Sequence, residues 1–218
     1  MNFLVLDTSS KYCSVVLSVN RVIYNDTREI PRQHNKYLLK MIQGVFAKAA
    51  IDIKDLDFIA YGVGPGSFVG VRLAAAVCQG FAISLDIPVI GFSSMFALAK
   101  SVITESQKVA VILDAKMGDF YLGLYDKDTD HIIAENVYKL EEYSQDLYTG
   151  YQLIGESITE LQVENNDFKI DVVNVLEYVY KQYQKQKYNG TLTQETFPVY
   201  LRGTSHWQTK EEYLYVDG

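Results

Sequence analysis

The stretch GVGPGSFVGVR, residues 62–72, is the part of the sequence that looks most like a catalytic or phosphate-binding loop. Gly64, Gly66 and Gly70 are spaced one residue wider than the dinucleotide fingerprint G-x-G-x-x-G, and Pro65 lacks the N–H that a phosphate cradle uses. The serine follows Gly66 directly, so the stretch does not contain the nucleophile turn G-x-S-x-G, and it lacks the G-K-[ST] of a Walker loop. A sharp strand-to-helix turn, with Ser67 capping the helix, is therefore favoured.

Two aspartates stand in the same local context. Asp7 ends the apolar run NFLVLD and Asp114 ends VAVILD, and each is followed by a hairpin, a strand, a turn and another strand. This repetition predicts a duplicated architecture, with chance similarity of two meanders as the alternative. Because a helix N-terminus can face an anion, a vestigial or shared nucleotide site is also kept as an alternative. Its lining would be Asp7, Thr8, Ser9, Gly64, Pro65, Gly66, Ser67, Phe68 and Asp114.

Residues that could carry other chemistry are few. The three histidines, at 34, 131 and 206, lie in no recognisable motif, so a Ser/His triad has little support. Cys13 and Cys78 both have apolar neighbours and are interpreted as reduced core thiols, not as a disulfide or metal site. The sequence therefore predicts no metal, no cofactor and no catalytic residue.

The remaining pattern predicts an α/β protein with two lobes, each a mixed sheet with flanking helices. Residues 33–50 and 67–85 have helical spacing on either side of the buried strand DFIAYGVG, and another helix is expected near 171–187. Polar TESQK, residues 104–108, is the best boundary. We expect lobes over 1–104 and 105–218, with the C-terminal tail able to pack back on the first lobe.

Charge is unevenly distributed between these lobes. The net charge is −7, but residues 1–100 carry ten Lys/Arg and seven Asp/Glu. This overall acidity argues against tight nucleic-acid binding by the chain alone. A basic repeat at Arg28, Arg32, Lys36 and Lys40 could contact RNA, although a solvated helix face is the favoured interpretation. No basic leader and no uncharged apolar run of about 18 residues occur, so we expect a cytoplasmic protein without a membrane segment.

The helix after the glycine-rich turn is apolar almost all round. We expect one face to cover the chain's own sheet, and this face contains Gly70, Leu73, Ala74, Val77, Gly80, Phe81 and Ser84. The other could be core or a subunit interface: Arg72, Ala75, Ala76, Gln79, Ala82 and Ile83. The helix at 33–50 has a similar apolar surplus, with Leu38, Met41, Ile42 and Val45 on one stripe.

Five motifs together resemble the TsaB family of tRNA threonylcarbamoyladenosine biosynthesis proteins. They are LDTSS, GVGPGSFVGVRLA, IPVIGFSS, DAKMGDFYLGLY and FPVYLR, in the family's order between residues 3 and 207, with Val69 where threonine is usual. The resemblance implies the duplicated ASKHA fold of actin, sugar kinases and Hsp70. It also implies a paralogous partner, TsaD, which transfers the threonylcarbamoyl group to the adenosine beside the anticodon of certain tRNAs.

The resemblance further implies that this chain is not the catalytic subunit. TsaD-like proteins hold a metal with an H-x-x-x-H pair, and the corresponding residues here are Ser94 and Leu98, which do not replace imidazole. The chain is then expected to bind TsaD through the helices at 33–50 and 68–85 and to help recruit the ATPase TsaE. Whether the free chain is a monomer or a homodimer is left open, and tRNA would be met only in the complex. A phosphotransferase using Asp7 and Asp114, or a peptidase-like protein acting on TsaD, are the alternatives.

Overall fold

The computed structural model describes residues 1–159, 169–199 and 201, and these residues form two compact units. The first unit contains Met1–Ser101 and Lys169–Pro198, while the second begins at Val102. The chain passes from the first unit to the second between Ser101 and Val102, and the sequence predicted a boundary after residue 104. However, residues 169–198 belong to the first unit and not to a second lobe running over 105–218.

A five-stranded mixed sheet forms the centre of the first unit. Its order is β3-β2-β1-β4-β5, with β1 antiparallel to β2 and parallel to β4. Strands β1 and β4 are buried almost throughout, as their unbroken apolar runs require, whereas β3 is an edge strand with a largely polar sequence. The strands are β1 Asn2–Asp7, β2 Tyr12–Val19, β3 Val22–Glu29, β4 Phe58–Gly62 and β5 Val89–Phe92.

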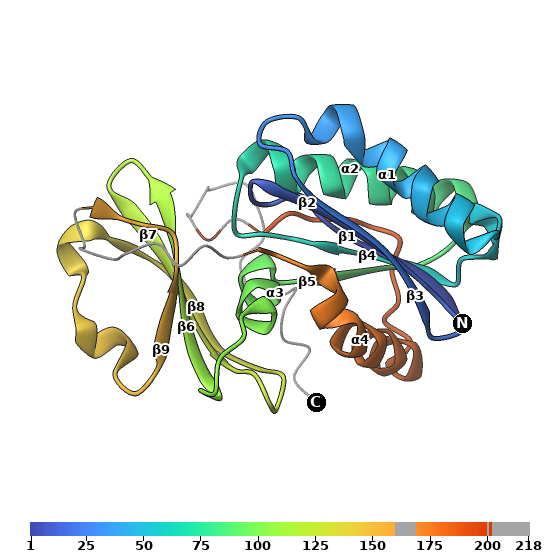
Figure 1. The fold of residues 1–218 in the computed structure, drawn as a ribbon. Coiled ribbons are helices and arrows are strands. Elements are labelled where there is room, and N and C mark those ends of the chain that lie inside the picture. Colours follow the sequence, from blue (N-terminus) through green and yellow to red (C-terminus); the bar gives the residue numbers. More distant parts are fainter. Residues whose placement is uncertain (160–168, 200, 202–218) are drawn as a thin grey trace. The chain divides into compact units, whose positions relative to one another are not determined.

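Two helices cover each face of this sheet (Figure 1). On one face lie α1, His34–Ala49, and α2, Phe68–Leu85, both ending at a residue in the left-handed conformation. On the other lie α3, Ser94–Ser101, and α4, Leu176–Asn189. Short 3-10 turns at Ile53–Asp55 and Val172–Val175 complete the unit. The helices expected from the sequence at 33–50 and 67–85 are confirmed.

Long-range contacts explain why residues 169–198 return to the first unit. The ring of Tyr183 on α4 stacks on Phe58 of β4 with centroids 4.3 Å apart. The Val172 N–H donates to the buried Ser14 hydroxyl at 3.1 Å. After α4 the chain runs along the edge of the sheet, where the Val89 N–H donates to the Thr193 carbonyl at 2.8 Å. Edge strand β5 is therefore covered by the chain itself.

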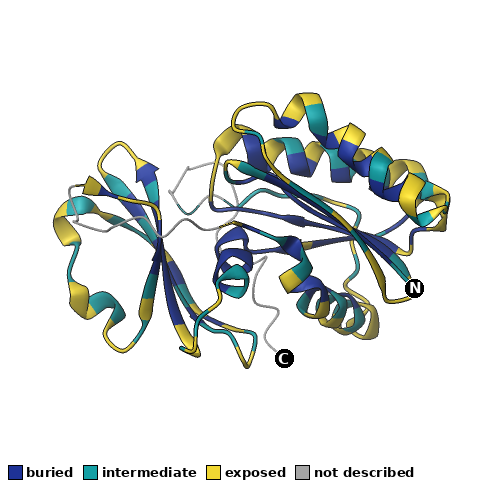
Figure 2. Ribbon diagram, viewed as in Figure 1, coloured by how far each residue is buried: buried dark blue, intermediate teal, exposed yellow. Residues whose placement is uncertain are grey.

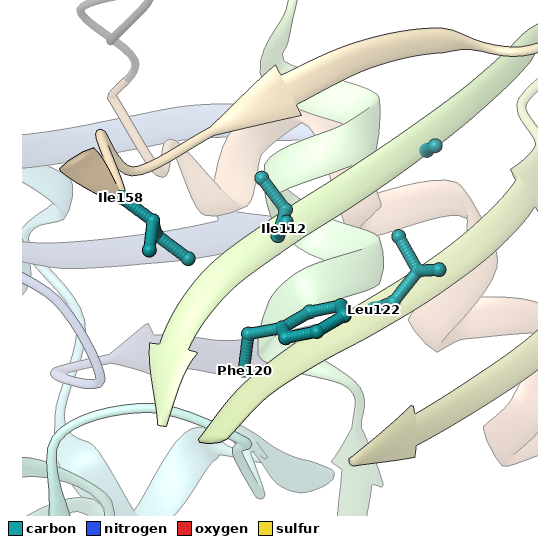
Figure 3. Packing of buried hydrophobic residues seen from close by; sticks show 5 residues of the cluster. Ile112, Phe120, Leu122 and Ile158 are labelled. Atoms are coloured by element: carbon teal, nitrogen blue, oxygen red, sulfur yellow. The ribbon is translucent and has the colours of Figure 1, made fainter. Parts of the chain in front are cut away.

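The second unit contains a four-stranded sheet in the order β8-β7-β6-β9. Its core includes Ile112, Phe120, Leu122 and Ile158, which pack together in Figure 3. The strand order repeats that of β3-β2-β1-β4, and β6 is again antiparallel to one neighbour and parallel to the other. The strands are β6 Lys108–Lys116, β7 Asp119–Asp126, β8 His131–Lys139 and β9 Gln152–Gly155, with 3-10 turns at Leu140–Glu142 and Gln145–Tyr148.

Candidate partner-binding face and the loops that hold it

The buried carboxylate of Asp7 joins three segments of the first unit. One oxygen accepts hydrogen bonds from the Ser9 N–H at 2.8 Å and the Ser9 hydroxyl at 2.7 Å. The other accepts from the Ser94 hydroxyl at 2.6 Å, and Ser94 in turn accepts from the Gly64 N–H at 3.2 Å. Asp7 therefore ties the end of β1 to the glycine-rich turn and to the start of α3.

The two residues after Asp7 hold the first turn of α2. The Thr8 hydroxyl donates to the Gly70 carbonyl at 2.7 Å, and the Ser67 N–H donates to the Ser9 carbonyl at 2.6 Å. Ser67 also caps the helix by accepting from the Gly70 N–H at 3.3 Å, as the sequence predicted. The start of α2 is thus fixed by polar contacts to the loop after β1.

Glycines allow these loops to approach closely. A Cβ on Gly70 would lie 1.9 Å from the Thr8 carbonyl oxygen, and one on Gly62 would lie 1.8 Å from an Asp7 carboxylate oxygen. Both separations are far below van der Waals contact. The glycines of this turn therefore serve packing between loops, and Asp7 receives its donors from the chain's own residues.

Burial raises the pKa of the Asp7 carboxyl, and hydrogen bonds from Ser94 and Ser9 together with the charge of His34 oppose that shift. The Cys13 thiol also lies in this region, and burial followed by the Asp7 charge raises its pKa to about 12. A carboxyl with a raised folded-state pKa binds more protons in the folded state than in the unfolded state. The folded state consequently loses stability as the pH rises from the unfolded pKa, about 4, through the folded value.

Asp7→Asn should therefore gain stability relative to the natural chain as the pH rises from about 4.5 to 7.5. Asparagine keeps the shape but carries no charge, so only the natural chain loses stability by ionisation of this group. Urea unfolding of both proteins across that range measures the difference. A difference that stays constant with pH would contradict the linkage of Asp7 to folding.

Ser94 and Leu98 were expected from the sequence to correspond to the metal ligands of TsaD-like proteins, and the structure gives both residues other contacts. Ser94 donates its hydroxyl proton to Asp7, and Leu98 is fully buried in the core. Among residues 1–159, 169–199 and 201, no three His, Cys, Asp or Glu side chains are grouped so as to hold a metal. In the second unit, the Asp114 carboxylate pairs with the Lys116 ammonium group at 2.5 Å, and the Asp114 backbone N–H donates to the Glu156 carboxylate.

The apolar stripe of α1 that the sequence assigned to a partner belongs to the core. Leu38, Met41, Ile42 and Val45 are between 0 and 3% exposed, because α1 uses this stripe to cover the sheet. They cannot contact a partner in this fold, and that prediction was wrong. The large apolar residue of α1 that is exposed is Leu39, at 58% of its full accessibility.

The faces of α2 are also rotated relative to the expectation. Ala75 and Ala82, expected on the partner side, are buried with Val71, Ala74 and Cys78 against the sheet. Conversely, Gly80 is exposed and Leu73, Val77 and Phe81 are only partly buried. A helix that is apolar all round has no polar side to show which face is exposed. The sequence therefore placed these residues on the wrong sides of α2.

Gln79 is occupied inside the chain. Its amide nitrogen donates to the Gln194 carbonyl at 2.9 Å, and its amide oxygen accepts from the Thr196 N–H at 2.9 Å. Gln79 thus binds the segment after α4 to the side of α2. Its assignment to a partner interface is replaced by this structural role.

Helix α2 nevertheless presents an apolar outer face. Val69 and Ile83 are 74% and 65% exposed, and Ala76 and Gly80 between them are exposed too. Their spacing of seven, four and three residues puts them on one side of the helix. Arg72 lies beside them with its guanidinium 3.4 Å above the Phe68 ring. Figure 2 shows the exposed sides of α1 and α2 turned away from the sheet. We call this surface the outer face: Leu39, Val69, Arg72, Ala76, Gly80 and Ile83.

Val69, Gly80 and Leu39 were not assigned to a partner by the sequence. A usable signal was the run Val71, Ala74, Ala75, Cys78, Ala82, whose helical spacing marks a small-residue core stripe and leaves the opposite side outward. By length and composition alone α2 could also cross a membrane. Its inner stripe, however, packs on the sheet of the first unit, as expected of a core helix with one outer face.

Comparison with known proteins gives consistent matches. The family model for TsaD, tRNA N6-adenosine threonylcarbamoyltransferase, matches residues 21–193. The TsaB protein of Buchnera aphidicola from Schizaphis graminum is 31% identical over 174 residues, covering 75% of this chain and 82% of that protein. TsaB of Haemophilus influenzae is 28% identical, covering 95% and 96%.

A solved structure agrees with these relatives. YeaZ from Pseudomonas aeruginosa superposes with a TM-score of 0.77 at 26% identity, covering 92% of this chain and 99% of that one. The α/β architecture with two mixed sheets, an ASKHA-like fold, is therefore confirmed. The matches in sequence and structure, together with the motifs around Asp7, Ser67 and Asp114, show that this chain belongs to the TsaB family of tRNA threonylcarbamoyladenosine biosynthesis proteins.

Proposed function

We propose that this chain is a non-catalytic cytoplasmic subunit in the synthesis of N6-threonylcarbamoyladenosine in tRNA, and that it binds the TsaD-type transferase of the same cell through its outer face. The exposed apolar side of α2 is the observation that carries the proposal. Val69 and Ile83 are each more than half exposed to water. A partner that covers these apolar side chains removes them from water, which favours the complex. Small residues at Ala76 and Gly80 leave room for a second helix to approach.

Several features favour a subunit over an enzyme. Ser94 and Leu98 stand where TsaD-like proteins carry metal ligands, and Asp7 is held by three hydrogen bonds within the chain. Tight contact between the loops at Gly62 and Gly70 further favours a role in positioning α2 over one in phosphate binding. The matching strand orders of the two sheets support descent of the units from one duplicated ASKHA motif.

The wider assembly follows from the same proposal. The pair formed with TsaD would provide the surface to which the ATPase TsaE is recruited, and tRNA would be bound by the complex and not by this acidic chain alone. In the absence of TsaD, two copies could cover the same apolar face as a homodimer.

A reconstitution tests this function. The purified chain, mixed with TsaD from the same organism, should form a complex whose mass is the sum of the subunits, and tRNA modification should require both. The chain alone should neither modify tRNA nor turn over ATP. Absence of a complex would overturn the proposal. ATP turnover by the isolated chain that is lost in Asp7→Ala would favour the phosphotransferase alternative instead.

A further inference from the structure

The two edges of the first-unit sheet are protected in different ways. Edge strand β3 has a largely polar sequence, and on it Arg28 pairs with Asp26 at 2.6 Å. Strand β5, at the other edge, has the sequence VIGF, which contains no charged residue, and three of its four residues are buried. Charged side chains on an edge strand discourage its pairing with another chain. Because β5 lacks them, its protection depends on the segment that covers it.

That segment is residues 190–198, which we call the strap. The Val89 N–H of β5 donates to the Thr193 carbonyl at 2.8 Å, and the Gln194 side-chain amide donates to the Asp86 carboxylate at 2.6 Å. Exposed and partly buried residues alternate over the first part of the strap, and no strap residue is buried. Hydrogen bonds therefore carry much of the attachment of the strap to the first unit.

Gln79 of α2 holds the strap at two of its residues. Its amide nitrogen donates to the Gln194 carbonyl at 2.9 Å. Its amide oxygen accepts from the Thr196 N–H at 2.9 Å and from the Thr196 hydroxyl at 3.0 Å. A segment that is attached by hydrogen bonds and has no buried side chain opens at a lower free energy than the whole fold. The strap meets this description, and the Gln79 side chain is the group that opposes its opening.

We infer that the strap opens without unfolding of the sheet, that Gln79 holds it closed, and that the closed strap prevents β5 from pairing with the β5 strand of a second copy of this chain. An open strap leaves the Val89 N–H without its acceptor, on a strand with no charge to repel a neighbour. A second copy presents the same uncharged edge, whereas β3 is polar and carries an ion pair. Gln79 is thus a positioning residue for the strap, and the inference does not depend on the proposed function.

Hydrogen exchange of single amides measures the opening in the natural chain and in Gln79→Met. Methionine keeps the length of the side chain but has no amide group, so the bonds to the strap are lost. The Val89 amide is the decisive one, because its own acceptor, the Thr193 carbonyl, is untouched by the substitution. It should exchange about tenfold faster in the variant, while the Leu4 amide of the central strand β1 keeps its rate.

Ser84→Ala is the matched control on the same helix. The Ser84 hydroxyl donates to the Phe81 carbonyl within α2, so its loss removes a hydrogen bond of the helix that does not reach the strap. The Val89 amide should exchange in this control as it does in the natural chain.

Self-association gives the second readout. In sedimentation velocity, Gln79→Met should form more large species than the natural chain as the protein concentration rises, because β5 is uncovered for a larger fraction of the time. This association should persist when Ala76→Glu is added, since that change places a charge on the outer face and not at the edge of the sheet.

Three results would contradict the inference. Equal Val89 exchange in Gln79→Met and the natural chain would show that Gln79 does not hold the strap. Acceleration of the Leu4 amide by the same factor would show that the variant weakens the whole sheet, so that the strap does not open independently. Unchanged self-association, or association that disappears with Ala76→Glu, would show that the strap does not protect β5 from a second copy.

Discussion

Ala76→Glu is expected to abolish binding of the TsaD partner while the isolated chain remains folded. Ala76 is exposed near the middle of the outer face, so in the free chain its replacement meets water. Against a closely packed partner helix the carboxylate would have to be desolvated, which costs several kcal/mol when it is unpaired. A loss of about 4 kcal/mol weakens binding roughly a thousandfold. Calorimetric titration with TsaD measures the loss of binding, and the melting temperature of the isolated variant shows whether the chain remains folded.

Companion variants sharpen this prediction. A glutamate at 76 lies one turn after Arg72 and could pair with it, so Ala76→Arg tests the same site without that partner. Tyr188→Glu is the control, since Tyr188 is 93% exposed on α4 and lies off the outer face. Ala75→Glu, one residue away but only 5% exposed, should instead prevent folding. If Ala76→Glu and Ala76→Arg both bind within threefold of the natural chain, the outer face is not the interface.

The extents of α1 and α2 could be read from the sequence because their signals are local. Apolar spacing gave the helices, and the Ser67 cap is confirmed by its hydrogen bond to the Gly70 N–H. The orientation of α2 could not be read in this way. With apolar residues on every side, only the sheet decides that Ala82 turns inward and Gly80 outward.

The stripe on α1 shows a second limit of sequence reasoning. Leu38 and Met41 were correctly placed on one apolar face, but periodicity does not tell whether that face meets the chain's own sheet or another protein. The return of residues 169–198 to the first unit also cannot be predicted from the local sequence. It depends on contacts such as Tyr183 on Phe58, between residues more than a hundred positions apart.

The role of the loop after β1 can be tested through one glycine of α2. Gly70→Ala should destabilise the chain by about 3 kcal/mol, because the new methyl group would lie 1.9 Å from the Thr8 carbonyl oxygen. That oxygen belongs to the backbone and cannot move aside without shifting the end of β1 or the first turn of α2. For a chain of this size the melting temperature should fall by roughly 6–12 °C.

Gly80→Ala in the same helix is the matched control, and it should act in the opposite direction. A Cβ at Gly80 has nothing within 4 Å, so alanine gains helix propensity without a clash. The free chain should be stabilised by about 0.5–1 kcal/mol. Because Gly80 lies on the outer face, this variant should still bind TsaD more weakly if the partner helix approaches closely there. Equal melting temperatures for Gly70→Ala and the natural chain would show that the loop does not hold α2. The polar contacts of Thr8 and Ser9 would then be incidental to the position of the outer face.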